Sequence, residues 1–340
     1  MNIATSGFKK DLGITISALI LVVFSIIVLR AIAPFVFPGY FIYLIVAVIC
    51  FLFFSQVGFD ILSAFSNHFY IGSVIFLILP LIIGQVTRGV VRWIPIGPIQ
   101  VQPSELVRPF LFVFFANELT HRDLKFNKFV KITLLFLIVD FLILVQPSLG
   151  VSVLTAVGYL GIVLATTFDK KKLLLMILIG VILAPLFWFF LKPYQRERII
   201  SFDNYNSIQA MISVGSGKIS GKGLGRGTET QLAFLPEKQT DFVFASIGEE
   251  LGFVGAGLVL LVSFFLLFRI SQAVSDAYNP ASRSFISGVF MALLFQVFVH
   301  VGMNMGILPI TGVTLPLVSA GGSSLVATAI ALGMVVGSKK

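Results

Sequence analysis

Long apolar runs separated by short polar segments follow one another along almost the whole chain. A membrane span needs roughly 20 apolar residues to cross about 30 Å of hydrocarbon, and its backbone polar groups must pair internally, which favours helices. The pattern predicts an all-α polytopic membrane protein, with a single transmembrane domain over residues 1–340 and about ten spans. The predicted spans cover residues 12–29, 35–54, 70–86, 104–120, 130–146, 149–167, 173–191, 251–270, 285–307 and 316–337.

The connection between the seventh and eighth predicted spans, residues 192–250, is much longer than the others. A connection of this length without strong apolar periodicity is usually functional or disordered. It contains a glycine-rich basic stretch, a proline-bounded segment and several carboxylates, so we expect it to be functional. The two halves of the chain differ in loop length and motif content, which disfavours a symmetric alternating-access transporter.

The cationic residues are unevenly divided between the two sets of connections. Lysine and arginine accumulate in the short cytoplasmic loops of membrane proteins. With the N-terminus inside, the short outer loops would hold only Arg30, Arg88 and Arg92. This asymmetry predicts a multi-pass protein of ten spans, with both termini in the cytoplasm and the long connection outside. The cytoplasmic segments would hold Lys9, Lys10, Arg122, Lys125, Lys128, Lys131, Lys170, Lys171, Lys172, Arg269, Arg283, Lys339 and Lys340.

Composition supports a lipid-embedded chain and excludes several other classes of protein. Hydrophobic residues make up 57% of the 340 residues and charged residues 11%, whereas soluble domains average about 45–50% apolar and about 25% charged residues. The single cysteine, Cys50, allows neither a disulfide within the chain nor a thiolate metal cluster. The net charge of +9 comes without a basic patch interleaved with aromatic residues outside the spans, so no nucleic-acid partner is predicted.

The segment 235–252 contains the strongest candidate for a catalytic group. Asp241 is expected above the eighth predicted span, at the outer interface of the membrane. It could be the N-cap of a short helix, as could Thr240. The alternative is a carboxylate at the water–lipid boundary, where partial desolvation would raise its pKa toward that of a useful general base. Glu249 and Glu250 could cap the next helix or pair with a basic loop residue.

Polar residues also gather at the start of the fourth predicted span. Pro103 fits the first turn of a helix, which Gln102 or Ser104 could cap. Glu105 and Arg108 would then lie three residues apart on one face, a spacing that allows an ion pair. Charges inside a span are rare and usually face a cavity or a partner. The pair is therefore either structural or part of the wall of an outward cavity.

Residues 214–228 contain six glycines interleaved with Lys218, Lys222 and Arg226. Such a stretch allows the backbone to approach phosphate oxygens closely, with the cations as charge partners. It is not a P-loop, because Gly223 stands where that motif needs serine or threonine. The alternative is a flexible loop whose charges stay solvated.

Proline and glycine residues between the last two predicted spans indicate a rigid outer turn. The serines and glycines at 319–324 can present backbone N–H groups and hydroxyls there. His300 is expected to be a hydrogen-bonded core residue, and residues 146–150 are interpreted as a turn between two spans. No cluster of histidine, cysteine and carboxylates has metal-site spacing, so no dedicated metal site is predicted.

Five of these segments, in this order, resemble the SEDS family (shape, elongation, division and sporulation), whose members include RodA and FtsW. The resemblance begins near residue 90 and extends to the C-terminus, whereas the first three spans match in hydropathy alone. Each motif is weak by itself, but five in register are specific. The matching text is Arg-Trp-Ile-x-Ile-Gly-Pro at 92–98 with Gln-Pro-Ser-Glu at 102–105, Gln-Pro-x-Leu-Gly at 146–150, Gly-x-Gly-Leu-Gly-x-Gly-Thr at 221–228, Leu-Pro-Glu-x-x-Thr-Asp-Phe-x-Phe-Ala at 235–245 with Gly-Glu-Glu-Leu-Gly-Phe at 248–253, and Gly-Met-x-x-Gly-x-Leu-Pro-x-Thr-Gly at 302–312 with Ser-x-Gly-Gly-Ser-Ser at 319–324.

The resemblance implies a peptidoglycan glycosyltransferase that polymerises lipid II at the outer face of a bacterial cytoplasmic membrane, for cell elongation or division. Asp241 would be the general base, and an α-linked donor with a β-linked product implies a single inverting displacement. A divalent cation, magnesium or manganese, is the one cofactor considered. Residues expected to bind the substrate are Arg92, Gln102, Ser104, Glu105, Arg108, Arg198, Lys218, Lys222, Arg226, Lys238, Thr240, Asn304, Thr311, Ser319, Gly321, Gly322 and Ser323.

The resemblance also implies a partner, a class B penicillin-binding protein with a single span and transpeptidase activity. Residues 227–237 favour the RodA-like branch. Three positions depart from the usual family pattern: Ser148 replaces an aspartate, Ala320 a tyrosine, and Arg108 a lysine, which keeps the charge but changes its hydrogen-bond geometry. The segment between Arg198 and Gln209 also looks short for the family.

Two other functions remain open at this point. A transporter that flips lipid-linked precursors would place its polar residues near the midplane and use both faces, whereas here the polar segments are expected on the outer side. A non-catalytic scaffold that holds a transpeptidase would tolerate Asp241→Ala.

Overall fold

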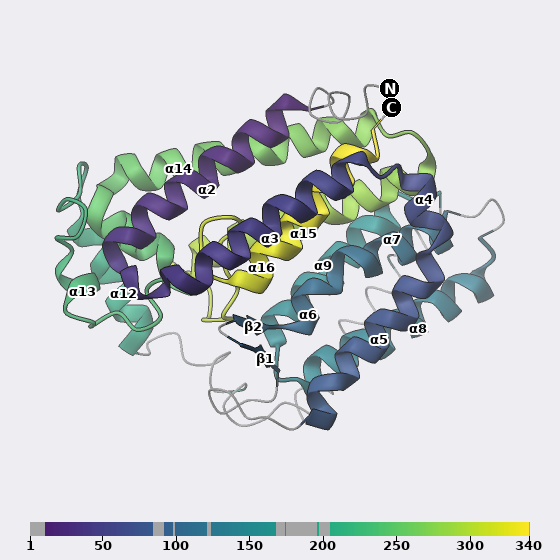
Figure 1. Ribbon diagram of the computed structural model, residues 1–340, viewed down its shortest axis with the longest axis horizontal. Helices are drawn as coiled ribbons and strands as arrows, with labels where there is room; N and C mark the ends of the chain where they lie inside the picture. The colour runs from purple at the N-terminus through teal and green to yellow at the C-terminus, as the bar shows by residue number, and fades with distance from the viewer. Residues whose placement is uncertain are drawn as a thin grey trace.

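The computed structural model describes residues 11–83, 92–97, 99–120, 124–167, 174, 196 and 205–339. Within them, helices cover every predicted span except the seventh, which lies outside the described residues apart from Leu174 (Figure 1). The helices of the spans are α2 (Leu12–Ile32), α3 (Phe37–Gln56), α5 (Ser66–Ile83), α7 (Arg108–Leu119), α8 (Phe126–Val145), α9 (Leu149–Leu164), α14 (Val243–Ser275), α15 (Pro280–Asn304) and α16 (Gly322–Gly337). The shorter elements are η1 (Pro34–Val36), α4 (Phe59–Ala64), α6 (Pro103–Leu106), α12 (Tyr205–Ser216), α13 (Thr228–Gln231), β1 (Ile94–Ile96) and β2 (Ile99–Val101).

The length and surface of these helices suit a lipid environment. Among the described residues, the stretches Leu12–Ile32, Pro34–Gln56, Val243–Ser275 and Pro280–Asn304 are long and apolar enough to cross a membrane. Large apolar side chains such as Leu19 and Leu261 are more than half exposed on α2 and α14, which is favourable in hydrocarbon and costly in water. The prediction of a polytopic α-helical membrane protein is confirmed.

Helix α16 forms the centre of the bundle. Every residue from Gly322 to Gly337 is buried, and α16 packs mainly against α3, while α15 packs against α9 and α14. Small residues allow the close approach of α16 to α3, since a Cβ atom added at Gly337 would lie 2.4 Å from the carbonyl oxygen of Val57. Close packing of small residues is a usual way to associate helices in membranes.

The first and last described residues, Asp11 and Lys339, lie together at one end of the bundle, here called the termini end. Asp11 caps α2 there by accepting the N–H of Ile14 at 3.1 Å, and forms ion pairs with Lys339 at 2.6 Å and Arg269 at 3.0 Å. Burial raises the pKa of Asp11, but the hydrogen bonds from Lys339, Ile14 and Arg269 outweigh burial and leave the pKa below its usual value. Asp11 therefore ties the start of α2 to the ends of α14 and α16.

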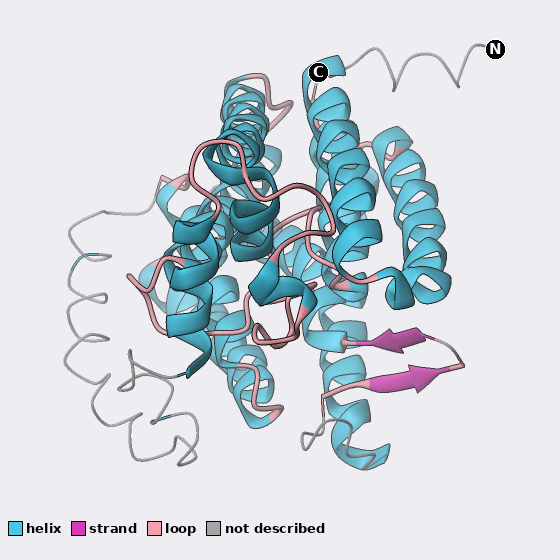
Figure 2. Ribbon diagram, turned by 90° about the vertical axis from the view of Figure 1, so that its left-hand side faces the viewer, coloured by secondary structure: helices cyan, strands magenta, loops and turns pink. Residues whose placement is uncertain are grey.

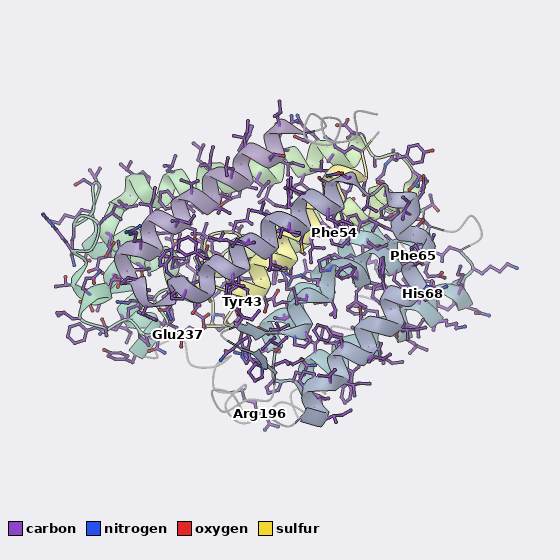
Figure 3. All side chains as sticks on the ribbon, viewed as in Figure 1. Tyr43, Phe54, Phe65, His68, Arg196 and Glu237 are labelled. Carbon is purple, nitrogen blue, oxygen red and sulfur yellow. The ribbon has the colours of Figure 1, made fainter. Side chains whose placement is uncertain are left out.

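The opposite end of the bundle, here called the loop end, consists of residues 92–101, 205–242 and 305–321 as far as they are described. A short antiparallel hairpin of β1 and β2 lies there (Figure 2), with Ile94 opposite Val101. The hydroxyl of Tyr43 on α3 (Figure 3) joins this hairpin to the bundle, since it contacts both the N–H and the carbonyl of Gln100 at 2.7 Å. The hairpin was not predicted from the sequence.

Two helix boundaries differ from the prediction for reasons visible at this end. Helix α14 begins at Val243 rather than at 251, because the helical first turns include polar residues that hydropathy placed in the loop. It bends at Gly252, whose φ of 66° and ψ of −163° are not helical. Helix α16 begins at Gly322 rather than at 316, because residues 316–321 form a loop.

Candidate functional site

Asp241 lies in a tight turn that ends where α14 begins. The carbonyl oxygen of Glu237 accepts the N–H groups of Thr240 at 3.0 Å, Asp241 at 3.1 Å and Phe242 at 3.3 Å. Phe242 is the N-cap residue of α14, and no side chain of its own caps the helix. The expectation that Thr240 or Asp241 is the N-cap is therefore wrong, because the turn places the helix start one residue later.

Asn304, at the end of α15, caps α14 from the neighbouring helix. Its Oδ1 accepts the N–H of Ala245 at 2.9 Å, and its Nδ2 donates to the carbonyl oxygens of Asp241 at 3.0 Å and His300 at 2.7 Å. Asn304 is fully buried, so both polar atoms of its side chain are engaged within the protein. This geometry fits a residue that positions Asp241 better than one that contacts a ligand.

The loop before α16 holds the other side of the same turn. Ser319 Oγ donates to the Thr240 carbonyl at 2.7 Å and accepts the N–H of Leu315 at 2.9 Å. The N–H of Ala320 donates to the Gln239 carbonyl at 2.8 Å. The backbone on both sides of Asp241 is thus fixed by two different segments of the chain.

Gly312 leaves space beside the Asp241 carboxylate. Its φ is +70°, and a Cβ atom added there would lie 3.6 Å from Asp241 Oδ2. Any side chain at this position would be strained in the backbone and would cover the carboxylate. Thr311, the preceding residue, directs its hydroxyl to Met303 Sδ at 3.8 Å. The loop end therefore brings Thr311 and Asp241 to the same region, since Gly312 follows Thr311 in the chain.

The glycine-rich loop folds around two carboxylates of its own chain. Glu249 is fully buried and accepts the N–H groups of Glu229 and Thr230 at 2.9 Å, so that it caps α13 from outside. Lys222 pairs with Glu249 at 2.7 Å. Glu250 accepts the N–H of Gly225 at 3.0 Å. The prediction of a basic partner is confirmed for Glu249, which pairs with Lys222. The alternative that these glutamates cap the next helix is wrong, because both lie inside α14, and Glu249 caps α13 instead.

The glycines of this loop serve the contact with α14. Gly221 has a φ of +78°, and a Cβ atom there would lie 2.2 Å from the Glu250 carbonyl oxygen. On the α14 side of this contact, a Cβ atom added at Gly252 would lie 2.3 Å from the Gly221 nitrogen. The backbone of this loop approaches α14 closely, and Gly225 donates its N–H to Glu250. The predicted approach to phosphate oxygens stays a prediction.

The cations of the loop end differ in their surroundings. Lys218 and Arg226 are exposed. Lys238 instead donates to the Thr230 carbonyl. Burial lowers the pKa of Lys238, and the nearby charges of Glu250 and Glu249 oppose that shift. Arg92 lies 5.5 Å over the ring of its neighbour Trp93, and Arg198 is outside the described residues.

A buried polar group connects the start of the fourth span with the neighbouring helices. Gln102 Nε2 donates to Ser104 Oγ at 3.2 Å and to Ser148 Oγ at 3.3 Å. The N–H of Gln102 donates to Ser323 Oγ at 2.8 Å. The turn predicted at 146–150 is present, but its polar role was not predicted, since Ser148 belongs to this hydrogen-bonded group. The aspartate that the family usually has at position 148 was the feature that could have indicated this role.

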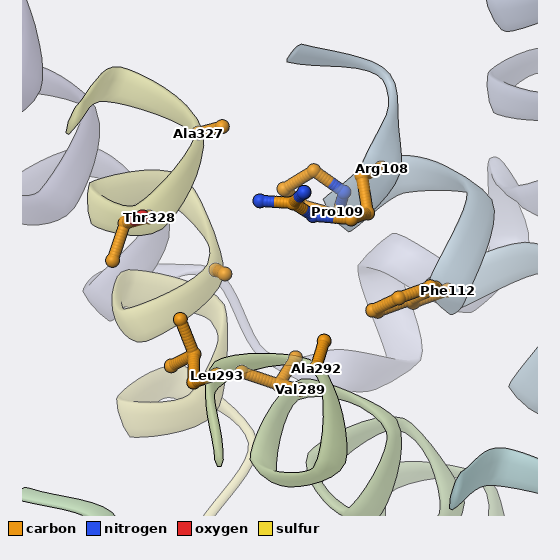
Figure 4. A pocket seen from close by; sticks show the side chains of 9 residues that line it. Arg108, Pro109, Phe112, Val289, Ala292, Leu293, Ala327 and Thr328 are labelled. Atoms are coloured by element: carbon orange, nitrogen blue, oxygen red, sulfur yellow. The ribbon is translucent and has the colours of Figure 1, made fainter. Parts of the chain in front are cut away.

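The predicted ion pair of Glu105 and Arg108 is confirmed at 3.0 Å, with both side chains buried. Arg108 lines a cavity between α7, α15 and α16, together with Thr328 and apolar side chains (Figure 4). Arg108 Nη1 and Thr328 Oγ1 are buried there without a hydrogen-bond partner. Glu105 holds Arg108 in place and does not itself line the cavity.

The two glycines at the start of α16 serve packing and helix initiation. Gly321 is its N-cap residue. A Cβ atom at Gly322 would lie 2.3 Å from the Tyr43 ring.

His300 is fully buried, with Nδ1 2.7 Å from the Val313 carbonyl oxygen, so its prediction as a core residue is confirmed. Within the described ranges, no group of three or more histidine, cysteine, aspartate or glutamate side chains could hold a metal ion.

The fold and this site define a class of protein. It is a polytopic membrane protein with a partly buried carboxylate at one end of a helical bundle, and hydrogen bonds hold the backbone around that carboxylate. Comparison with known proteins identifies the family. The model for the cell cycle proteins FtsW, RodA and SpoVE matches residues 8–339, and the chain belongs to this family.

Individual relatives agree with that assignment. The chain is 33% identical to the peptidoglycan glycosyltransferase MrdB of Escherichia coli K12, over 83% of this chain and 80% of MrdB. It is 34% identical to a probable peptidoglycan glycosyltransferase FtsW of Buchnera aphidicola, over 85% and 80% of the two chains.

Solved structures share the fold over nearly the full length. A chain from a peptidoglycan synthase complex, described as coordinating polymerisation and crosslinking, superposes with a TM-score of 0.82 at 30% identity and covers 96% of each chain. The rod shape determining protein RodA of Thermus thermophilus superposes with a TM-score of 0.74 at 27% identity, over 96% and 95% of the two chains.

Proposed function

We propose that the protein is a peptidoglycan glycosyltransferase that polymerises lipid II, with Asp241 as general base. The observation that carries this proposal is the double fixation of the Asp241 turn, by Asn304 on one side and by Ser319 and Ala320 on the other. A base must be held within hydrogen-bond reach of the proton that it removes. The names of the relatives support the same reaction.

The proposed reaction is a single displacement at the anomeric carbon of the donor sugar. Asp241 accepts the proton of the acceptor hydroxyl as its oxygen bonds to that carbon. The bond from the anomeric carbon to the pyrophosphate oxygen breaks, and the polyprenyl pyrophosphate leaves with the electron pair. Attack from the opposite face converts the α-linked donor into a β-linked glycan. Lys218 and Arg226, both exposed in the glycine-rich loop, are proposed to offset the charge of the leaving pyrophosphate.

Further residues are proposed to line the substrate site. Arg108, fixed by Glu105, presents a cation to the cavity in Figure 4. Gln102, Ser104 and Ser323, which are joined by hydrogen bonds, are proposed to offer further polar contacts. We also retain as candidates the residues Arg92, Arg198, Lys222, Lys238, Thr240, Thr311, Gly321 and Gly322.

We propose that a divalent cation, magnesium or manganese, would enter with the pyrophosphate. Magnesium is usually bound through substrate phosphates with few protein ligands. A chelator titration of polymerisation tests this proposal: activity lost with EDTA and restored by excess magnesium supports it, and activity unchanged by EDTA overturns it.

The proposed setting is the bacterial cytoplasmic membrane, with both termini in the cytoplasm and the loop end outside. The uneven distribution of lysine and arginine supports this orientation. Cysteines placed at residue 226 and at residue 276 test this orientation when intact cells are treated with a membrane-impermeant thiol reagent. Only the cysteine at residue 226 should react, and reaction of only the cysteine at residue 276 would contradict the orientation.

The proposed partner is a class B penicillin-binding protein. The similarity to a chain from a complex that coordinates polymerisation and crosslinking supports this partner.

The activity test uses purified protein in vesicles with fluorescent lipid II, with and without the partner. Wild type and Asp60→Asn, a change of an exposed aspartate at the termini end, should give glycan polymer, whereas Asp241→Ala and Asp241→Asn should give none. Polymer from the Asp241 variants would support a scaffold with no need for this base. Movement of lipid II across vesicles without any polymer would support the transporter.

A further inference from the structure

Helix α12, in the long connection, has its amphipathic faces reversed relative to a soluble protein. The residues that it buries are small: Ser207, Ala210 and Ser213. Its large apolar residues are turned outward and are 39–57% exposed: Tyr205, Ile208, Met211 and Ile212. A helix in water normally buries its large apolar side chains and exposes its polar ones, so the environment of this exposed face needs an explanation.

The exposed face of α12 leads into the apolar surface of α14. Ile219, which follows α12, is 72% exposed, and Phe253 and Val254 on α14 are 75% and 62% exposed. The N–H of Val254 donates to the Ile219 carbonyl at 3.2 Å, and the N–H of Phe253 donates to the Lys218 carbonyl at 2.8 Å. Because α14 crosses the membrane, its exposed apolar residues face lipid, and Ile219 lies directly beside them.

We propose that α12 is an interfacial membrane helix whose exposed face lies in the outer leaflet, at the boundary between headgroups and acyl chains. Helices that lie in this boundary bury an apolar face about 5–10 Å deep. Lys218, exposed beside Ile219, can extend its ammonium group toward lipid phosphates while its stem stays among apolar groups. The occupant of this face is therefore lipid rather than a protein.

The buried face of α12 packs against the start of α14, next to Asp241. Ala210 packs with Phe242 and Ala245, on either side of the α14 start, and a Cβ atom at Gly248 would lie 3.3 Å from Val214 Cα. Phe242 directly follows Asp241. The depth of α12 in the outer leaflet thus sets the depth of Asp241. The importance of this depth for catalysis rests on the proposed function.

The depth of α12 can be measured with nitroxide labels in lipid bilayers, without the partner. In a Cys50→Ser background, Ile212→Cys is compared with Leu261→Cys on the lipid-facing side of α14 and with Arg226→Cys in the exposed loop. The Ile212 label should collide with oxygen more than with a water-soluble nickel chelate, as the Leu261 label does. Collision with the chelate as frequent as at residue 226 would overturn the proposal, and protection only after adding a transpeptidase would overturn it in favour of a protein partner.

Polymerisation in vesicles gives the functional arm. Ile208→Gln with Ile212→Gln should lower the polymer yield severalfold, while Leu232→Gln, which changes an apolar residue exposed elsewhere in the same connection, should leave it unchanged. Equal yields from all these proteins would overturn the link between α12 and catalysis. A wild type without polymer would contradict the proposed function, whereas the label depths would still test the position of α12.

Discussion

At the scale of single residues, the site depends on buried side chains that hold the backbone of the Asp241 turn through hydrogen bonds. Asn304 and Ser319 both bind carbonyl groups of the Asp241 turn. The ion pair of Glu105 and Arg108 was predictable, because its partners are three residues apart in one predicted helix, although the structure places them on the successive helices α6 and α7. The role of Asn304 was not, because Ala245 and Asp241 come near it only when α14 packs against α15.

Asn304→Ala is predicted to reduce both stability and activity. The change leaves the buried N–H of Ala245 without its acceptor, which costs about 1–3 kcal/mol, and it frees the Asp241 turn. Asn279→Ala is the matched control, since Asn279 caps α15 at the termini end through the N–H of Ser282 at 2.7 Å. Thermal unfolding should show a loss for both variants, but polymerisation should fall only for Asn304→Ala. An equal loss of activity in both would mean that Asn304 acts through stability alone.

Glu105→Gln is predicted to be much more damaging than Glu118→Gln. The first change leaves Arg108 charged and buried, and removing one partner of a buried ion pair costs about 3–5 kcal/mol. The pair of Glu118 with Lys128, at 3.4 Å, is more exposed and should contribute about 0–1 kcal/mol. Denaturation curves and polymer yields of the two variants measure the difference, and similar values would argue against a special role for Glu105.

At the scale of elements, hydropathy predicted the spans well and their loop-end boundaries poorly. The first turns of α14 contain Glu249 and Glu250, which hydropathy placed in the loop. Their carboxylates accept N–H groups of the glycine-rich loop and of α13. Helix α12 was not predicted, because its 12 residues are too few to cross a membrane and the long connection was expected to lack apolar periodicity. Both features depend on contacts between segments distant in sequence.

Gly221→Ala is predicted to detach the glycine-rich loop from α14. The new Cβ atom would meet the Glu250 carbonyl in a backbone conformation that alanine rarely adopts. Gly215→Ala in α12 is the control, since nothing lies within 4 Å of its Cβ position, and it should be neutral or stabilise the helix by about 0.5–1 kcal/mol. Limited proteolysis should cut the loop faster in Gly221→Ala only. Equal cleavage rates would contradict a role for this glycine in docking the loop.

At the scale of the whole molecule, the bundle separates a structural end from the candidate site. The Asp11 ion pairs join α2, α14 and α16 at the termini end, whereas the Asp241 turn joins α14, α15 and the loop before α16 at the other end. Hydropathy predicted where most helices of the described residues lie, and the resemblance predicted the family. Which helices are neighbours could not be predicted, because lipid-facing and partner-facing positions are both apolar.

Stability is predicted to depend on pH through Asp11. Its pKa in the folded protein lies below the ordinary value of 3.8, so its contribution to the free energy of unfolding is fully present above that value. The contribution is lost as the pH falls through the lower folded pKa. Asp11→Asn should lower stability at neutral pH by about 1–3 kcal/mol and weaken the acid dependence seen in thermal unfolding. Asp60→Asn should leave both unchanged, and an identical acid dependence in wild type and Asp11→Asn would contradict this role.

The most direct test of the central claim compares binding and turnover of lipid II by wild type and Asp241→Asn in the same vesicles. The substitution removes the base with almost no change in size. The account predicts that Asp241→Asn binds lipid II with an affinity close to that of wild type and forms no glycan polymer. Polymer formed at a rate close to that of wild type would contradict the assignment of Asp241 as the general base.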